Sequence, residues 1–222
     1  MQDWYTLSMK ITKFGHCCLL LEIDGTRLLT DPGVFSTGED LVRDIDAILI
    51  THEHADHFHI ESVKAIIANN PQVIIITNTA VGALLGKESL PFTRVGDGES
   101  TTIKGVTISG HGKDHAIIYG DMGKCENTGF MVAGTFFFPG DNFFNPGVPV
   151  DVLALPMAGP WMKLSEAIDY AKAVTPRVAF PVHDGIYRAD FGPAFVSRMG
   201  ETLLSPASIQ FIGLNAGETK EF

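Results

Sequence analysis

The chain has 222 residues, of which 45% are hydrophobic and 19% charged, a balance that excludes wholesale disorder and fibrous repeats. Its 16 Lys and Arg stand against 26 Asp and Glu, so the net charge is −10 with histidine neutral. A nucleic-acid binder normally carries a basic face toward the phosphates, and we therefore expect no nucleic-acid partner.

Cysteine usage and apolar run lengths point to the cytoplasm. The cysteines are Cys17, Cys18 and Cys125, an odd number in which the adjacent pair is too strained for an ordinary disulfide. We expect a reducing compartment, with Cys17 and Cys18 packed in the core. No secretory signal is visible in residues 1–10, and runs such as 73–76 are too short to span a bilayer. The prediction is a cytoplasmic protein without membrane association.

Short apolar runs separated by turn residues predict strands in the first third of the chain. Asp24-Gly25 is a hairpin signal between two of them. Residues 46–51 form a nearly continuous apolar run, which is typical of a strand buried on both faces. The predicted strands are 10–14, 17–23, 27–30, 46–51 and 73–77, and the predicted helices are 60–68 and 80–85.

The remaining elements alternate strands with helices, and the middle of the chain is rich in strands. Ser165 is a candidate helix cap. No repeat or linker divides the chain, so we predict one domain over 1–222 of the α/β (α+β) class, with two packed sheets and outer helices. The predicted strands are 101–103, 106–109, 115–119, 129–132, 135–138, 152–155, 178–182 and 209–212, and the helices are 165–174 and 194–204.

Four of the eight histidines lie between His52 and His59, directly after the buried strand 46–51. The segment 51–57 (THEHADH) places imidazoles and a carboxylate at the carboxyl end of a strand, where α/β folds bind ligands. Imidazole nitrogen and carboxylate oxygen are the ligands of zinc-like and iron-like ions. His52 and His54 project to one side of an extended chain, and the turn into the helix directs later residues to a second point. The segment is therefore better suited to two adjacent ions than to one.

Three further candidate metal ligands lie at the ends of predicted strands. His115 opens a predicted strand, whereas Asp141 and His183 each follow an apolar one. Taken singly, each has an ordinary structural explanation as a turn residue or a hydrogen-bonded histidine. Their shared context with the histidine cluster favours joint use in one metal site.

The order of these motifs resembles the metallo-β-lactamase fold superfamily. The motif H-x-H-x-D-H at 52–57 is followed by His115, Asp141 and His183, and Thr30-Asp31-Pro32 also matches. The resemblance covers essentially the whole chain. It implies a four-layer αββα sandwich of two mixed β-sheets with the metals at one edge.

Within that superfamily the chain is similar to compact metal-dependent hydrolases related to ascorbate-6-phosphate lactonases. The matching pieces are Phe14-Gly15-His16, Asp114-His115-Ala116 and Pro160-Trp161. This similarity implies a metal-dependent hydrolase, in which a metal-bridging hydroxide attacks a small ester, lactone or phosphoester.

The resemblance also implies a set of metal ligands. One ion would be held by His52, His54 and His115, the second by Asp56, His57 and His183, and Asp141 would bridge them. The expected cofactors are two divalent ions, zinc first, with manganese or iron as alternatives.

Two ligand assignments needed a choice between neighbouring histidines. His111 lies four residues before His115 and competes for its place, although the run at 115–117 favours His115. His59 follows the motif into the predicted helix, where we expect it to be exposed and unbound.

Other residues receive roles beside the metals. Asp56 and Asp141 would orient the nucleophile, and Asp31 would hydrogen-bond the metal-bearing loop or one of its imidazoles. His16 is either a pocket or supporting residue or a purely structural one. Trp161 is a candidate for the pocket mouth.

Tyr187 is a second candidate for the pocket mouth. Lys163 and Arg188 could receive an anionic substrate group, although solvated charges are the preferred interpretation of both. Short spacers favour a small-molecule substrate over a polymer, and a homo-oligomer stays open. The rival functions are an iron-dependent redox enzyme similar to persulfide dioxygenases and a non-catalytic metal-binding module.

Overall fold

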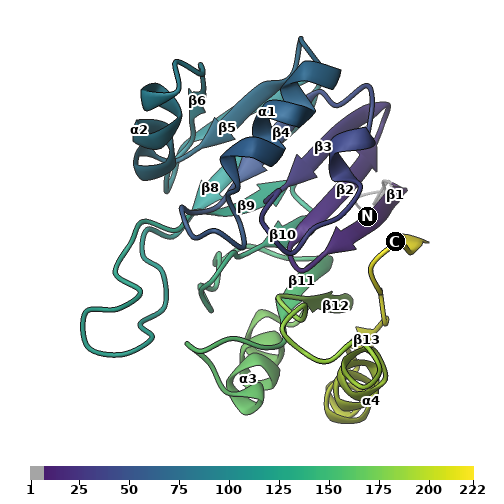
Figure 1. Cartoon of the computed structure of the whole chain (residues 1–222). Coiled ribbons are helices and arrows are strands. Elements are labelled where there is room, and N and C mark those ends of the chain that lie inside the picture. The colour runs from purple at the N-terminus through teal and green to yellow at the C-terminus, as the bar shows by residue number, and fades with distance from the viewer. Residues whose placement is uncertain (1–7) are drawn as a thin grey trace.

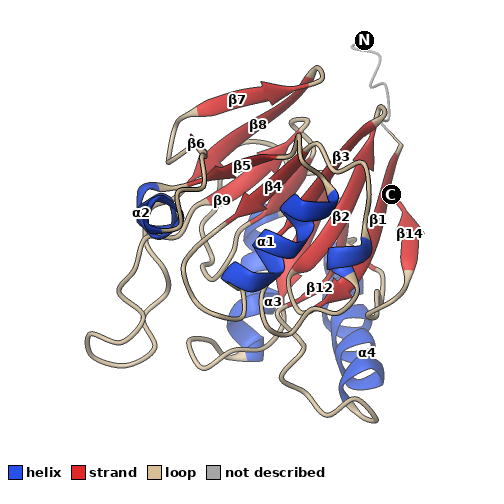
Figure 2. Ribbon diagram, turned by 45° about the horizontal axis from the view of Figure 1, so that its top comes forward, coloured by secondary structure: helices blue, strands red, loops and turns tan. Residues whose placement is uncertain are grey.

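Two seven-stranded β-sheets lie face to face in the computed structural model, which describes residues 8–222, and helices cover their outer faces (Figure 1). Figure 2 shows the layers from a second direction. Most of the segment considered for a signal sequence, residues 1–7, lies outside the described part of the chain. The predicted αββα arrangement is confirmed.

The first sheet begins with antiparallel neighbours and ends with parallel ones. From β1 to β3 the strands are antiparallel, and from β3 to β6 they are parallel. All four residues of β4 are buried, as its unbroken apolar run predicts. In spatial order the strands are β14 (Thr219–Glu221), β1 (Met9–Gly15), β2 (Cys18–Ile23), β3 (Thr26–Thr30), β4 (Ala47–Ile50), β5 (Ile74–Thr77) and β6 (Thr93–Arg94).

The second sheet repeats this pattern. From β7 to β10 neighbouring strands are antiparallel, and from β10 to β13 they are parallel. In spatial order the strands are β13 (Gln210–Phe211), β12 (Val178–Val182), β11 (Val152–Pro156), β10 (Phe136–Phe138), β9 (Gly129–Val132), β8 (Val106–His111) and β7 (Ser100–Ile103). The carboxyl ends of parallel strands in both sheets therefore meet along one edge of the sandwich, where loops can converge.

Four α-helices within residues 8–222 pack on the outside. One apolar cluster joins the first sheet to α1 and α2, another joins the second sheet to α3 and α4, and a third fills the space between the sheets. Cys17 and Cys18 are buried in these clusters, as predicted. The helices are α1 (Ile60–Asn69), α2 (Thr79–Lys87), α3 (Leu164–Val174) and α4 (Gly192–Leu204), and short 3₁₀ turns are η1 (Glu39–Leu41) and η2 (Ser205–Ala207).

Two local predictions are wrong. Residues 115–119 form no strand, because the amide N–H groups of His115 and Ala116 donate to the carbonyls of Cys125 and Asp141, and the loop leaves the sheet. Ser165 lies inside α3, whose first turn is held by the Glu166 carboxylate, which accepts from the backbone N–H of Lys163 at 2.7 Å.

The short strands β6 and β14 were not predicted, since two or three residues give too little periodicity. Across residues 8–222, no helix combines the length and the apolar character needed to cross a membrane.

Candidate metal centre

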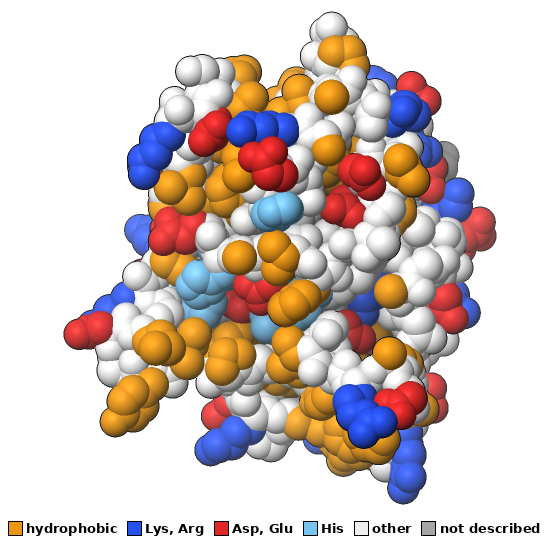
Figure 3. Space-filling view, viewed as in Figure 1, with side chains coloured by type: hydrophobic (Ala, Val, Ile, Leu, Met, Phe, Trp, Pro, Cys, Tyr) orange, Lys and Arg blue, Asp and Glu red, His pale blue; other side chains and the backbone are white. Residues whose placement is uncertain are grey.

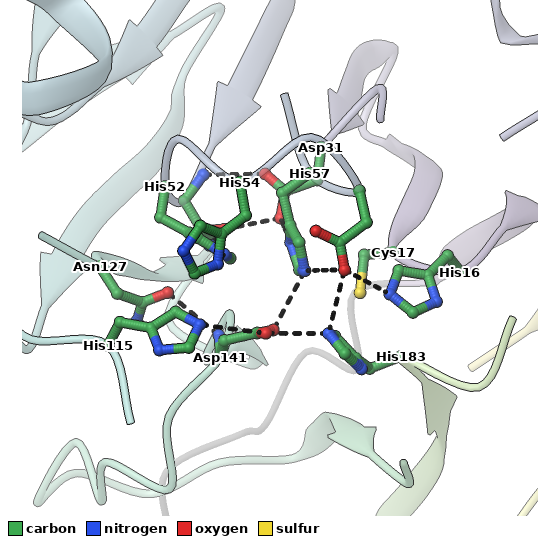
Figure 4. Close-up of polar contacts among 12 residues, drawn as sticks. His16, Cys17, Asp31, His52, His54, His57, His115, Asn127, Asp141 and His183 are labelled. Carbon is green, nitrogen blue, oxygen red and sulfur yellow. Dashed lines mark hydrogen bonds and ion pairs between the residues drawn. The ribbon is translucent and has the colours of Figure 1, made fainter. Parts of the chain in front are cut away.

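Loops at the carboxyl ends of strands in both sheets bring the predicted metal ligands together (Figure 4). They form two groups, and within each group one ligand atom per residue lies within 4.8 Å of the others. The first group is His52, His54, His115 and Asp141, and the second is His16, Asp56, His57 and His183. The members come from the loops after β4, β8, β10 and β12 and from the β1–β2 turn.

In the first group the histidine rings crowd around one point. Nε2 of His52 lies 3.2 Å from Nδ1 of His54. The ring centroid of His115 lies 4.9 Å from that of His52 and 4.5 Å from that of His54. Three imidazoles packed this closely direct lone pairs at a shared position, as a tetrahedral metal site requires.

Asp141 touches both groups. Its Oδ2 lies 3.3 Å from Nε2 of His115 in the first group and 2.8 Å from Nε2 of His183 in the second. Its Oδ1 lies 3.1 Å from Nε2 of His57. A carboxylate between two sets of imidazoles is placed to bridge two cations.

Asp56 faces the second group with a single oxygen. Its Oδ2 lies 3.6 Å from Nε2 of His183, 3.8 Å from Nε2 of His57 and 3.3 Å from Nε2 of His16. A quarter of the Asp56 side chain, 25%, is exposed, whereas the three rings are almost completely buried. The site therefore opens to solvent on the side of Asp56.

The outer ring nitrogens of two histidines donate to backbone carbonyls. Nδ1 of His183 donates to the carbonyl oxygen of Ala158 at 2.6 Å, and Nδ1 of His115 donates to that of Ala116. A neutral imidazole carries only one proton, so each inward Nε2 keeps a free lone pair. This is the tautomer that a metal ligand needs.

Asp31 fixes the same tautomer in His57 and, through Thr51, in His52. Asp31 Oδ2 accepts from Nδ1 of His57 at 2.7 Å and from the hydroxyl of Thr51 at 2.7 Å. The Thr51 hydroxyl oxygen then accepts from Nδ1 of His52 at 3.0 Å. One fully buried carboxylate thereby orients two of the ligand rings.

His16 is held in the opposite tautomer. The backbone N–H of Gly185 donates to Nδ1 of His16 at 3.1 Å, so that nitrogen supplies a lone pair and the proton of the neutral ring lies on Nε2. Nε2–H faces Oδ2 of Asp56. His16 is thus oriented as a hydrogen-bond donor to a ligand, although its position alone would allow it to be a ligand.

The residues present fit a metal pair. Among residues 8–222, buried side-chain atoms without a hydrogen-bond partner include Nε2 of His57, His115 and His183 and Oδ1 of Asp141. Buried polar atoms are rarely left unpaired in folded proteins, and here the four atoms converge at the two groups. Divalent cations would satisfy all four atoms.

Protonation states in the metal-free protein match this chemistry for three of the ligands. Burial lowers the pKa of His52, which is therefore neutral. Burial by itself would raise the pKa of Asp141, but the charge of His57, together with the other histidines around the carboxylate, outweighs burial and holds that pKa well below its usual value. For Asp56, burial by itself would also raise the pKa, but the hydrogen bond from His16 and the neighbouring charge of His57 together lower it.

His57 differs from the other histidines. Burial by itself would lower its pKa, but the charge of Asp141 together with the hydrogen bonds to Asp141 and Asp31 outweighs burial, and the pKa lies well above its ordinary value. A metal that binds Nε2 of His57 must therefore displace a proton, which couples metal affinity to pH.

Comparison with known proteins agrees with this geometry. The family model described as "Beta-lactamase superfamily domain" matches residues 10–183. The chain belongs to the β-lactamase superfamily.

Relatives of this superfamily member extend over most of its length. Protein Rv0786c of Mycobacterium tuberculosis is 38% identical over 198 residues, which cover 87% of this chain and 92% of the relative. A UPF0173 metal-dependent hydrolase of Aeropyrum pernix is 26% identical, covering 96% of this chain and 97% of its own. The solved structure of Igni18, a metallo hydrolase of Ignicoccus hospitalis, has a TM-score of 0.77 at 21% identity and covers 97% of this chain and 98% of its own.

The two other candidate histidines of this β-lactamase superfamily member lie outside both groups. His111 ends β8, where its Nε2 lies 3.0 Å from the Ser109 hydroxyl. His59 precedes α1 and is half-buried, with Nδ1 3.1 Å from the Ser62 hydroxyl. Geometry therefore leaves His115, not His111, beside His52 and His54.

Trp161 lies behind the ligands instead of at a pocket mouth. It is only 9% exposed, and its indole N–H donates to Asp141 Oδ2 at 2.7 Å. Tyr187 is half-buried, and it lines a cavity of about 190 Å³ together with His16.

Asn127 supports the site and was missed by sequence reasoning. Its Oδ1 accepts from the backbone N–H of Asp141 at 3.0 Å, and its Nδ2 donates to the carbonyl of Pro139 at 3.0 Å. Gly140 has φ +65°, and a Cβ there would lie 2.3 Å from Asn127 Oδ1. A single Asn in a loop carries no sequence signal that would have identified it.

The backbone is strained where the site is built. His16, Asp31 and His183 have positive φ values of 33°, 33° and 55°. Non-glycine residues rarely adopt this region, and such strain concentrates at functional sites.

Proposed function

We propose that the chain is a hydrolase with two divalent metal ions, zinc first, that cleaves a small ester, lactone or phosphoester. The observation that carries the proposal is the position of Asp141, whose two oxygens reach His57, His115 and His183 across two groups of ligands. When bound, two such ions lower the pKa of water to near neutrality and polarise the electrophile.

We assign the ligands from the tautomers. His52, His54 and His115 would hold one ion. Asp56, His57 and His183 would hold the other, and Asp141 would contact both, since each residue has a ligand atom close to those of its group. His16 stands outside this set because the N–H of Gly185 occupies its Nδ1, so the proton of the neutral ring stays on Nε2, whereas in His57 Asp31 holds the Nδ1 proton and a metal can displace the one on Nε2.

The protein's own residues have distinct roles in the reaction. Asp56, partly exposed, would accept a proton from the attacking water and orient it toward the substrate. The Nε2–H of His16 would keep Oδ2 of Asp56 in place. Asp141 is held by the indole of Trp161 and by Asn127, so it would stay fixed while the substrate changes shape.

Metal analysis and a substrate panel test the proposal together. Purified protein should contain two equivalents of metal and hydrolyse at least one chromogenic ester, lactone or phosphodiester. Asp56→Ala combined with His57→Ala should abolish hydrolysis and remove metal while circular dichroism stays unchanged. His111→Ala is the control and should keep both. Unchanged hydrolysis in the double variant would contradict the proposal.

The rival functions predict different results in the same experiment. A redox enzyme would purify with iron and consume dioxygen with a thiol or persulfide substrate. A non-catalytic module would bind metal tightly and turn over no member of the panel.

A further inference from the structure

We propose that this site takes an uncharged, largely apolar substrate and discriminates against anionic ones. The inference rests on the proposed hydrolase function and names the substrate class of the same site.

Exposed apolar side chains lie beside two histidines of the metal centre, and a third follows His183 along the chain. The ring of Phe35 lies 5.3 Å from that of His16 and is 49% exposed. Ile117 is 49% exposed and lines the same cavity as His115. Ile186, 51% exposed, follows His183 in the same loop. Figure 3 shows this face, with pale-blue histidines bordered by orange side chains and the blue Lys and Arg mostly toward the periphery.

A cavity of about 590 Å³ adjoins the centre on the side of His115. Its lining includes Ile117 and one cation, Lys124, together with the carboxylates of Asp114 and Glu126. Lys124 is also ion-paired with Asp121. Apart from the proposed metal ions, the charges that line this cavity therefore sum to a negative value, which disfavours an anionic substrate group away from the metals.

The cavity of about 190 Å³ on the side of His16 offers no free cation either. Its lysine, Lys13, is buried and bonds Asp184 Oδ1 at 2.6 Å and the carbonyl of Pro181 at 2.9 Å. Arg188, in the following loop, is held by Asp190 through two contacts of 3.0 and 2.6 Å. A substrate carboxylate or phosphate would therefore meet cations that already have carboxylate partners.

Desolvation decides between neutral and charged substrates. Apolar substrate surface placed against the exposed Phe35, Ile117 and Ile186 leaves water, which favours binding. An anionic group placed there loses hydration without gaining a partner, which is costly. The metal ions would contact only the reacting group, so the bordering residues select the rest of the molecule.

Matched esters test the inference. p-Nitrophenyl butyrate and p-nitrophenyl hemisuccinate share a leaving group and a four-carbon acyl chain, and differ in one carboxylate. We expect kcat/KM for the butyrate to be larger by about tenfold or more. The neutral triester dimethyl p-nitrophenyl phosphate should likewise be preferred over the anionic diester methyl p-nitrophenyl phosphate. Each kcat/KM is first divided by the rate of hydrolysis of the same compound in metal-containing buffer, because the diester is intrinsically slower to react. Equal or inverted preference would overturn the inference while leaving a hydrolase.

A binding measurement separates this inference from the proposed function. Butyrohydroxamic acid and the monohydroxamate of succinic acid carry the same metal-binding group, and calorimetry on the zinc-loaded protein gives both dissociation constants. The neutral compound should bind about tenfold more tightly. The ratio of the two dissociation constants tests the inference even if no ester is hydrolysed. A failure to hydrolyse any ester would refute the hydrolase proposal alone. Equal affinities, or no binding of either compound, would overturn the inference.

Charge-introducing variants test where the selection occurs. Ile117→Lys and Ile186→Lys should each shift both ratios toward the anionic partner by about fivefold to tenfold. Ile74→Lys is the matched control, because Ile74 is also exposed, at 41%, but begins β5 at the edge away from the metal-bearing loops. If all three variants leave the ratios unchanged, the proposed surface does not contact the substrate.

Discussion

Gly33 packs directly against the backbone of Asp56. A Cβ added to Gly33 would lie 1.9 Å from the carbonyl oxygen of Asp56 and 2.5 Å from the amide nitrogen of His57. The segment that follows β3 therefore packs directly against the backbone of the metal-bearing loop, and no side chain fits between them.

Gly33→Ala should displace the loop at 52–57. We expect a loss of about 1–3 kcal/mol in the free energy of unfolding, typical of overpacking at a rigid contact, together with loss of metal from the second ligand group. Urea denaturation and metal analysis measure these effects. Gly86→Ala is the control, since a Cβ there meets nothing within 4 Å and α2 tolerates Ala. Normal metal content in Gly33→Ala would contradict the expectation.

Asp31→Asn should weaken metal binding although it preserves shape. Both carboxylate oxygens accept hydrogen bonds, from His57 Nδ1 and from the Thr51 hydroxyl and amide. An Asn must place its NH₂ group against one of these donors, so one hydrogen bond is lost and the proton of His57 is no longer held on Nδ1 by a carboxylate. We expect zinc affinity to fall about 10–100-fold in a competition titration with a chelator.

The control for this experiment is Asp24→Asn. Asp24 lies in the β2–β3 hairpin with φ 46°, a conformation that Asn accepts well. Equal zinc affinities of the two variants would refute the role of Asp31.

The tautomer of His16 can be observed directly. Because Gly185 N–H donates to Nδ1, the ¹⁵N spectrum of the zinc-loaded protein should show a neutral ring protonated on Nε2. His16→Gln, which keeps a donor near that position, should still bind two equivalents of metal. His183→Gln should bind fewer. Loss of one equivalent in His16→Gln would make His16 a ligand.

Burial of His16 should also affect stability as a function of pH. Burial lowers its pKa from 6.5 to about 4 in the folded state. Between these values the unfolded chain takes up a proton that the native chain does not, so stability falls as pH falls, by up to about 1.4 kcal/mol per pH unit. Urea denaturation of metal-free protein should give a shallower decline for His16→Gln than for wild type. Parallel curves would contradict this assignment.

Trp161→Phe should loosen Asp141. The variant removes the indole N–H that donates to Asp141 Oδ2 at 2.7 Å, and it leaves an aromatic ring in place. We expect about tenfold weaker zinc binding with unchanged secondary structure. Phe143→Leu is the control, because Phe143 packs on Trp161 at a ring-centroid distance of 5.0 Å and does not contact the hydrogen bond. An equal loss in both variants would assign the effect to packing.

The layered fold and the loop at 52–57 could be predicted from the amino-acid sequence alone. Both depend on local patterns: short apolar runs form the strands, and ligands spaced within one turn share a loop regardless of the rest of the chain. The assignment of each ligand to an ion stays a prediction. The same local reasoning failed at 115–119, where the apolar residues Ile117 and Tyr119 are exposed on a loop.

The tautomer of His16 and the contacts that hold Asp141 depend on the tertiary structure. The donor that sets the tautomer of His16 belongs to Gly185, 169 residues away, and Asp141 is held by Asn127 and Trp161 from two other loops. A tautomer depends on which partner meets each ring nitrogen, and such partners come together only when distant strand ends reach one edge of the sandwich. The net charge of −10 is a count of residues and carries no information on where they lie. The structure shows that Lys13 and Lys124, beside the site, are paired with carboxylates.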